Sequence, residues 1–224
     1  MRVAITTDRF DRISDLYRST GLDPVWLPCI RVEPAPDEVL ARAREATAEA
    51  GVLVLASART VDLLWPQAPM PSIDVVAVGT ATENAVTKKG GRVTVRGSQG
   101  LEALAVKART QLEHAKVVFP RSADSDPAAL RVIRSLAPDL LELEVYRTQL
   151  VAPQKNWVEA VAFASPSAVE GWHLTRDIDE LVVGVIGATT WAAAARYREP
   201  DVVASIPSHR ALAQALASHM EVKV

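Results

Sequence analysis

An internal repeat with one constant offset is the strongest constraint on how this sequence of 224 residues can fold. Three pairs of segments are alike, and 108 positions separate the members of each pair: Leu53–Arg59 with Val161–Ser167, Val76–Thr82 with Gly184–Thr190, and Glu102–Ala105 with Arg210–Ala213. Generic likeness among strand–helix units would not keep one spacing across three segments. The repeat therefore predicts two similar domains, each of about a hundred residues, which is an ordinary domain size.

Short apolar runs alternate with helical patterns along the chain. The runs that are rich in valine, isoleucine and alanine, and that we interpret as buried strands, are residues 3–5, 52–55, 75–78, 117–119, 160–163 and 182–186. Continuous β-branched runs between loops are typical of parallel strands that are covered on both faces. Their alternation with helices predicts an α/β fold with two similar parallel-sheet domains.

Two further extended segments have the character of connectors. Residues 27–34 are bracketed by Pro28 and Pro34, which favours an edge strand or an isolated ladder. Residues 143–148 alternate with a period of two, as a strand does. Their partial likeness predicts that the two segments pair as a two-stranded β-ladder between the domains.

Composition and charge exclude several classes of protein. The formal net charge of -2 gives no basic footprint for nucleic acid. The longest uncharged stretch in the C-terminal half, Leu181–Ala195, is shorter than the ~20 residues of a membrane helix. Cys29 is the only cysteine, which excludes a disulfide framework and a cysteine-based metal site. No charged-then-apolar leader follows Met1. We expect a cytoplasmic monomer with no membrane or nucleic-acid partner.

Hydroxyl side chains recur where a predicted strand gives way to a helix. These residues are Ser57, Thr82, Ser165, Ser167, Thr189 and Thr190. Such hydroxyls cap the first amides of a helix, and capping alone explains several of them. The same amides also attract anions, and ligands of parallel sheets bind beyond the carboxyl ends of the strands. Arg31, Arg59, Arg121 and Arg147 are candidate cations for an anionic ligand, although any of them can be a solvated surface charge.

Motifs of other kinds of catalytic site are missing from the sequence. There is no GxSxG elbow, no phosphate-binding glycine loop and no metal-ligand spacing among the four histidines. A serine nucleophile or a metal centre is therefore not indicated.

The motifs, taken in order, resemble the uroporphyrinogen-III synthase family. Those in the C-terminal half are Val145–Thr148, Phe163–Val169, Ile186–Thr190 and Ile206–Ser208. Those in the N-terminal half are Pro28–Pro34, Ala56–Arg59 and Val78–Thr82. The resemblance covers nearly the whole chain. Two stretches depart from it: Arg121–Ser122 stands where the family often has Arg-Gly, and Thr6–Asp8 stands where many members have Thr-Arg-Pro.

The resemblance implies a domain layout and a reaction. Residues 1–29 and 152–224 would form a discontinuous first domain and 36–143 a second, joined by linker strands at 30–35 and 144–151, with the active site in the interdomain cleft. The substrate would be hydroxymethylbilane, a linear tetrapyrrole with eight carboxylates. The product would be uroporphyrinogen III, formed with loss of water and inversion of ring D through a spiro intermediate. No metal or organic cofactor is implied.

The resemblance also implies roles for individual residues. Tyr146 matches the family's tyrosine, and we expect it on the linker facing the cleft, where its phenol can donate to the departing hydroxyl. A half-buried strand tyrosine with a packing role is the alternative. The residues expected to bind the substrate are Ser57, Arg59, Thr82, Arg121, Ser165, Pro166, Ser167, Gly187, Thr189 and Thr190.

Two other functions remain open from the sequence. A non-catalytic tetrapyrrole-binding or regulatory module of the same fold would keep the strand-end hydroxyls without turnover. We expect no DNA-binding segment after Val224, which disfavours a regulator. A sugar- or amino-acid-binding protein of periplasmic type is disfavoured by the expected absence of a leader.

Overall fold

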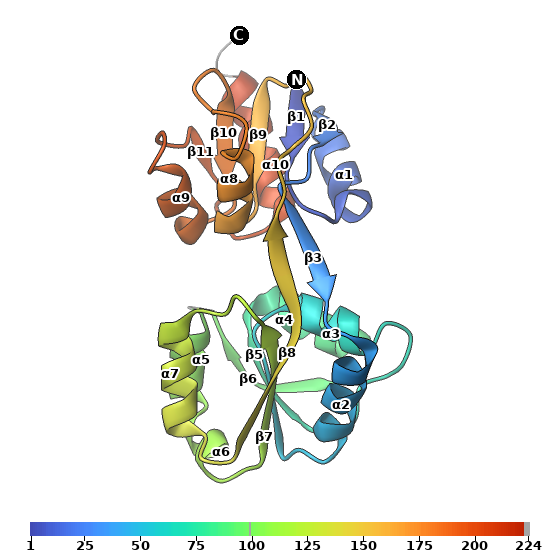
Figure 1. The fold of residues 1–224 in the computed structure, drawn as a ribbon. Coiled ribbons are helices and arrows are strands. Elements are labelled where there is room, and N and C mark those ends of the chain that lie inside the picture. The colour runs from blue at the N-terminus through green and yellow to red at the C-terminus, as the bar shows by residue number, and fades with distance from the viewer. Residues whose placement is uncertain (99, 222–224) are drawn as a thin grey trace. The chain divides into compact units, whose positions relative to one another are not determined.

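The computed structural model describes residues 1–98 and 100–221, and the chain divides into two compact units. Unit 1 comprises residues 1–32 and 148–224, and unit 2 comprises 33–147. The chain passes from unit 1 to unit 2 within β3 (Ile30–Pro34) and returns within β8 (Leu140–Leu150), and these strands lie next to each other in the sheet order. Figure 1 shows the arrows of β3 and β8 pointing in opposite directions.

Unit 1 is built on a five-stranded sheet in the order β11-β10-β9-β1-β2. Its strands are β1 (Arg2–Ile5), β2 (Asp23–Trp26), β9 (Ala160–Phe163), β10 (Val182–Val185) and β11 (Val202–Val203). Its helices are α1 (Phe10–Arg18), α8 (Pro166–Trp172), α9 (Ala188–Ala194) and α10 (His209–Glu221). All the neighbouring strands pair in parallel, so their carboxyl ends meet at one edge of the sheet.

Two apolar clusters cover the two faces of the unit 1 sheet. One cluster gathers α8 and α9 through residues such as Trp172 and Ala194. The other gathers α1 and α10 through Ile13 and Leu212. The strands are short runs of valine, alanine and isoleucine because both of their faces are buried.

Unit 2 contains the strand order β8-β7-β4-β5-β6, with β3 beyond β8. Its strands are β4 (Val52–Leu55), β5 (Asp74–Val78), β6 (Arg92–Gly97) and β7 (Val117–Ser122), together with β8. Its helices are α2 (Asp37–Ala48), α3 (Ala58–Leu64), α4 (Gly79–Lys88), α5 (Gly100–Lys107), α6 (Arg109–Glu113) and α7 (Pro127–Leu136). Figure 1 shows α2 and α3 on one side of this sheet and α5, α6 and α7 on the other, in agreement with its two apolar clusters.

The predicted repeat corresponds to repeated structure. β4 and α3 match β9 and α8 residue for residue at the offset of 108 positions, and Leu104 and Leu212 are both fully buried on equivalent helices. The strand order β8-β7-β4-β5-β6 of unit 2 corresponds to β2-β1-β9-β10-β11 of unit 1. The prediction of two similar parallel α/β domains is confirmed. Both sheets also have a switch point, between β7 and β4 and between β1 and β9, where ligands of open parallel sheets bind.

Candidate functional site: the carboxyl edges of the two sheets

Strand register places Ser57, Gly79 and Tyr146 at the same height along the strands of the unit 2 sheet. Leu55 pairs with Ala77, which puts Ser57 level with Gly79, two residues beyond each partner. On the other side of β4, Leu53 pairs with Val118, so Ser57 comes level with Ser122, whose register partner is Tyr146. Ser57, Gly79 and Tyr146 therefore share the carboxyl edge of this sheet, and Ser57 lies beside the switch point.

Ser57 caps α3 in the way its sequence position suggests. Its hydroxyl oxygen accepts a hydrogen bond from the backbone N–H of Arg59 at 3.2 Å. Ser165 does the same at the equivalent place in unit 1, where it accepts from Ala168 N–H at 3.2 Å. The exposed ring of Pro166 occupies the first turn of α8, where its missing N–H costs nothing. Capping thus fixes both strand-to-helix turns and leaves both serines half-buried at the edge.

Gly187 and Gly79 begin the second equivalent turn of each unit. Phe163 pairs with Val185, so Ser165 and Gly187 are level at the carboxyl edge of unit 1. Gly79 adopts a φ of 76°, a conformation that favours glycine, whereas Gly187 is extended with a φ of 172°. The two turns thus differ in backbone conformation at the glycine, although the residues that follow have the same pattern of burial.

Burial separates the threonines of these turns into two kinds. Thr82 and Thr190, at equivalent positions of the repeat, are 3% and 1% exposed. Thr80 and Thr189 are exposed at the starts of α4 and α9. The structure therefore directs Thr82 and Thr190 inward, toward the sheet, and brings Thr189 to the surface. Thr80 was not singled out by sequence reasoning, and its place next to Gly79 is the signal that could have found it.

Tyr146 lines a cavity of about 490 Å³ within unit 2. Its ring is half-buried and packs against the apolar cluster beneath α2 and α3, while its carbonyl oxygen accepts from Ala123 N–H at 2.8 Å. The charged residues of the cavity wall are Glu33, Glu144 and Arg147. Tyr146 therefore packs as a half-buried strand tyrosine and also lines this cavity.

Arg121 is held by its neighbours on β7 and β8. Its guanidinium donates to Glu142 at 2.8 Å, to Glu144 at 3.0 Å and to the Ser122 carbonyl oxygen at 2.8 Å. Hydrogen bonds from Arg134, supported by Arg121, hold the pKa of Glu142 below its ordinary value. With its residue only 8% exposed, Arg121 braces β8 at the bulge before Tyr146, rather than projecting from the surface.

The remaining predicted residues, Arg59 and Ser167, lie in the first turns of two helices that follow the strand ends. Arg59 is half-buried in the first turn of α3 and interacts within the protein, and Ser167 is half-buried in the first turn of α8.

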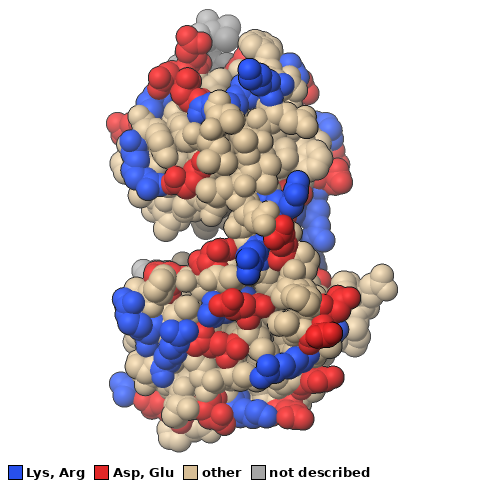
Figure 2. All heavy atoms as spheres, viewed as in Figure 1, with Lys and Arg blue, Asp and Glu red and all other residues tan. Residues whose placement is uncertain are grey.

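Figure 2 shows basic and acidic residues interspersed over the viewed face of each unit. Within residues 1–98 and 100–221, no three His, Cys, Asp or Glu side chains group as metal ligands. In the same part of the chain, no helix has the length and apolar character needed to cross a bilayer.

The fold of two parallel α/β units is similar to that of solved structures from one class of enzyme. A mutant uroporphyrinogen III synthase from the extremely thermophilic bacterium Thermus thermophilus has 15% sequence identity with a TM-score of 0.66, covering 99% of each chain. A uroporphyrinogen-III synthetase from Helicobacter pylori has 14% identity with a TM-score of 0.64, covering 99% of this chain and 98% of that one. At these identities the likeness establishes the fold. No curated protein sequence gave a significant match.

The sequence itself establishes the family. The family described as uroporphyrinogen-III synthase HemD matches residues 11–214, which is most of the chain. The chain belongs to this family of cyclising enzymes of tetrapyrrole biosynthesis.

Proposed function

We propose that this protein converts hydroxymethylbilane to uroporphyrinogen III, with loss of water and inversion of ring D. Family membership over residues 11–214 is the observation that carries the proposal. The fold supports it, because each unit presents main-chain amides and hydroxyls at the carboxyl edge of a parallel sheet. Such donors suit a substrate with eight carboxylates, and they need no strongly basic surface.

The reaction demands control of shape more than proton transfer. Loss of the hydroxyl from ring A leaves a cation that the electron-rich pyrrole stabilises. The substituted carbon of ring D then attacks to give a spiro intermediate, and fragmentation and reclosure invert the ring. In free solution the unsubstituted position attacks instead, which gives the type I isomer. The protein must therefore hold the flexible chain in the one pose that brings the substituted carbon to the cation.

Small differences in binding suffice for this selection. Each factor of ten in isomer preference requires about 1.4 kcal/mol. Hydrogen bonds to charged groups contribute about 1.5–3 kcal/mol each. We assign carboxylate binding to the amides and exposed hydroxyls of the turns after β4, β5, β9 and β10, with Ser57, Ser165 and Thr189 among the donors. Thr82 and Thr190 are buried, so their side chains are less accessible to a ligand than that of Thr189.

Tyr146 is the residue that we place nearest the chemistry. It lies at the carboxyl edge of unit 2, it lines a cavity of about 490 Å³, and packing holds its ring in place. Its phenol O–H donates a hydrogen bond to the hydroxyl that leaves ring A and transfers to it the proton that makes it water. The proton that the ring carbon loses when ring D recloses returns to the phenolate. Arg121 supports this role as a positioning residue, through its hydrogen bonds across β7 and β8.

The test is an isomer analysis. Hydroxymethylbilane, generated enzymatically and used at once, is incubated with the purified protein, and the products are oxidised to porphyrins and separated. The proposal predicts mainly the type III isomer, against type I in buffer alone. Type I product together with tight tetrapyrrole binding would instead identify a non-catalytic binding module.

A further inference from the structure

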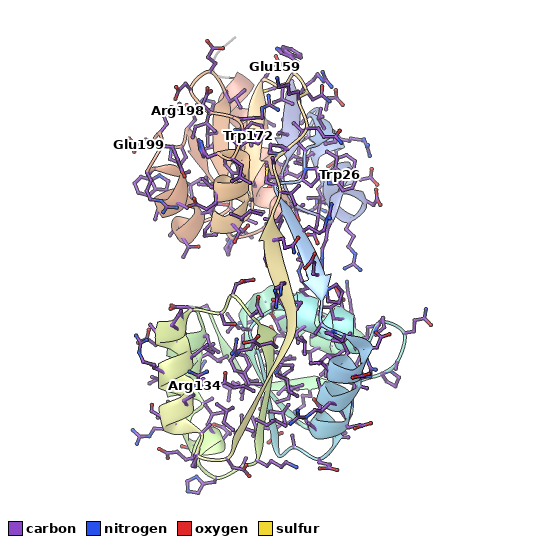
Figure 3. All side chains as sticks on the ribbon, viewed as in Figure 1. Trp26, Arg134, Glu159, Trp172, Arg198 and Glu199 are labelled. Carbon is purple, nitrogen blue, oxygen red and sulfur yellow. The ribbon has the colours of Figure 1, made fainter. Side chains whose placement is uncertain are left out.

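Trp26, the last residue of β2, is a large aromatic side chain that is fixed in place yet half in solvent. It is 52% exposed. Its indole Nε1–H donates to the Thr7 carbonyl oxygen at 3.0 Å, and its ring stacks on Phe10 with 6.1 Å between the centroids. Figure 3 labels Trp26 beside α1. A tryptophan held in this way exposes a ring surface at a defined place, although burial would stabilise the fold more.

Trp26 forms one wall of a cavity of about 300 Å³ within unit 1. Asp8 and Arg31 supply its charged groups, and the rest of its lining is apolar, including Ile30 and Val151. Because β1 and β2 are parallel, the cavity lies at the carboxyl edge of the sheet. Ligand cavities range from about 300 to 1,000 Å³. The volume therefore suits a single ring with its side arms, and not a whole linear tetrapyrrole.

The three polar and aromatic groups of this cavity match the three binding features of a pyrrole. A pyrrole ring has a π face, one N–H donor and, in this substrate class, acidic side arms. The Trp26 ring offers a surface for stacking. The Asp8 carboxylate accepts a hydrogen bond from the Thr7 hydroxyl at 3.2 Å and has a further interaction within the protein. A carboxylate has about four acceptor positions, so it can take a pyrrole N–H in addition to these partners. The Arg31 guanidinium suits a carboxylate arm.

We propose that Trp26, Asp8 and Arg31 form a subsite that binds one pyrrole ring of the linear tetrapyrrole, with the ring stacked on Trp26. This inference rests on the proposed function and adds a determinant of substrate binding to it. The subsite acts on binding and leaves the ring-closing chemistry to other groups.

The experiment compares variants of two exposed tryptophans. Trp26→Leu removes the aromatic face, and Trp26→Phe keeps a smaller one. Trp157→Leu is the matched control, because Trp157 is 64% exposed in unit 1 but precedes β9, at the amino end of the strands, and lines a different cavity. KM for hydroxymethylbilane, kcat and the fraction of type III isomer are measured for each variant, and thermal unfolding shows which variants are folded.

We expect Trp26→Leu to raise KM roughly three- to tenfold, the range that corresponds to an aromatic contact. Trp26→Phe and Trp157→Leu should each stay within about twofold of wild type, and Arg31→Gln, which keeps the tryptophan, should raise KM like Trp26→Leu. If Trp26→Leu does not fold, Arg31→Gln decides alone. An active wild type with KM unchanged in the folded variants would overturn the subsite and leave the proposed function standing. A wild type that makes no type III isomer would overturn both.

Discussion

Replacement of Gly171 by alanine tests the packing that joins α8 to the segment before β3. A Cβ at Gly171 would overlap the carbonyl oxygen of Cys29 and lie 2.9 Å from its carbonyl carbon. That carbon must withdraw by roughly 1 Å to reach an ordinary contact distance. The same carbonyl oxygen accepts from Val151 N–H at 2.9 Å, so the withdrawal also strains this hydrogen bond.

The expected loss follows from these contacts. Overpacking against backbone costs about 3 kcal/mol, and the hydrogen bond contributes about 1 kcal/mol. Alanine's better helix propensity offsets about 1 kcal/mol. The free energy of unfolding of unit 1 should therefore fall by about 3 kcal/mol, and its thermal midpoint by about 13 °C for a unit of about a hundred residues.

Urea unfolding followed by tryptophan fluorescence measures this change, because Trp172 of α8 is fully buried in unit 1. Gly187→Ala is the control: its Cβ would meet only Pro207 Cβ, at 3.9 Å, and its backbone is extended. The control should lose less than about 1 kcal/mol. A Gly171→Ala protein that is as stable as the control would refute the close approach of α8 to Cys29.

The remaining predictions concern the site and the pH dependence of stability. Tyr146→Phe should lower kcat for ring closure about tenfold or more without lowering the midpoint of thermal unfolding; unchanged turnover would remove Tyr146 from the mechanism. Ser165→Ala should destabilise unit 1 by about 1 kcal/mol in urea unfolding, through loss of a helix cap, and a change near zero would contradict capping. Arg121→Gln should lower the free energy of unfolding by about 2 kcal/mol, and by no more, because Glu142 keeps Arg134 as a partner. An unchanged free energy of unfolding would show that Arg121 does not brace β8. Burial lowers the pKa of His209 to about 4, below its ordinary value of about 6.5. The neutral imidazole therefore contributes at most about 3 kcal/mol to the free energy of unfolding, a contribution that is present above pH ~6.5 and is lost as the pH falls toward 4. His209→Gln should flatten that part of the stability curve, and an unaltered slope would refute the assignment.

The fold could be predicted from sequence because both faces of each central strand are buried. Burial on both faces makes runs such as Val52–Leu55 continuously apolar, and the repeat then fixed the number of domains. The peripheral strands β2, β6 and β11 were missed. β2 contains Pro24, and β6 alternates polar with apolar residues because it lies at the edge of its sheet. Edge strands carry a weaker pattern than central ones.

The candidate site was predictable only in part. Caps follow from local sequence, so the roles of Ser57 and Ser165 as helix caps could be expected, and the structure contains both. Burial within a helix turn depends on which face meets the sheet, and the sequence alone did not distinguish buried Thr190 from exposed Thr189. The partners of Arg121 come from a neighbouring strand whose register only the fold sets.

The central claim is that the carboxyl-edge turns of both units bind the carboxylates of one substrate class. Amide chemical shifts of ¹⁵N-labelled protein, followed during titration with uroporphyrinogen III under reducing conditions, test it residue by residue. We expect saturable shifts in the turns after β4 and β5 and in those after β9 and β10. Shifts confined to the amino ends of the strands, or to one unit alone, would contradict it.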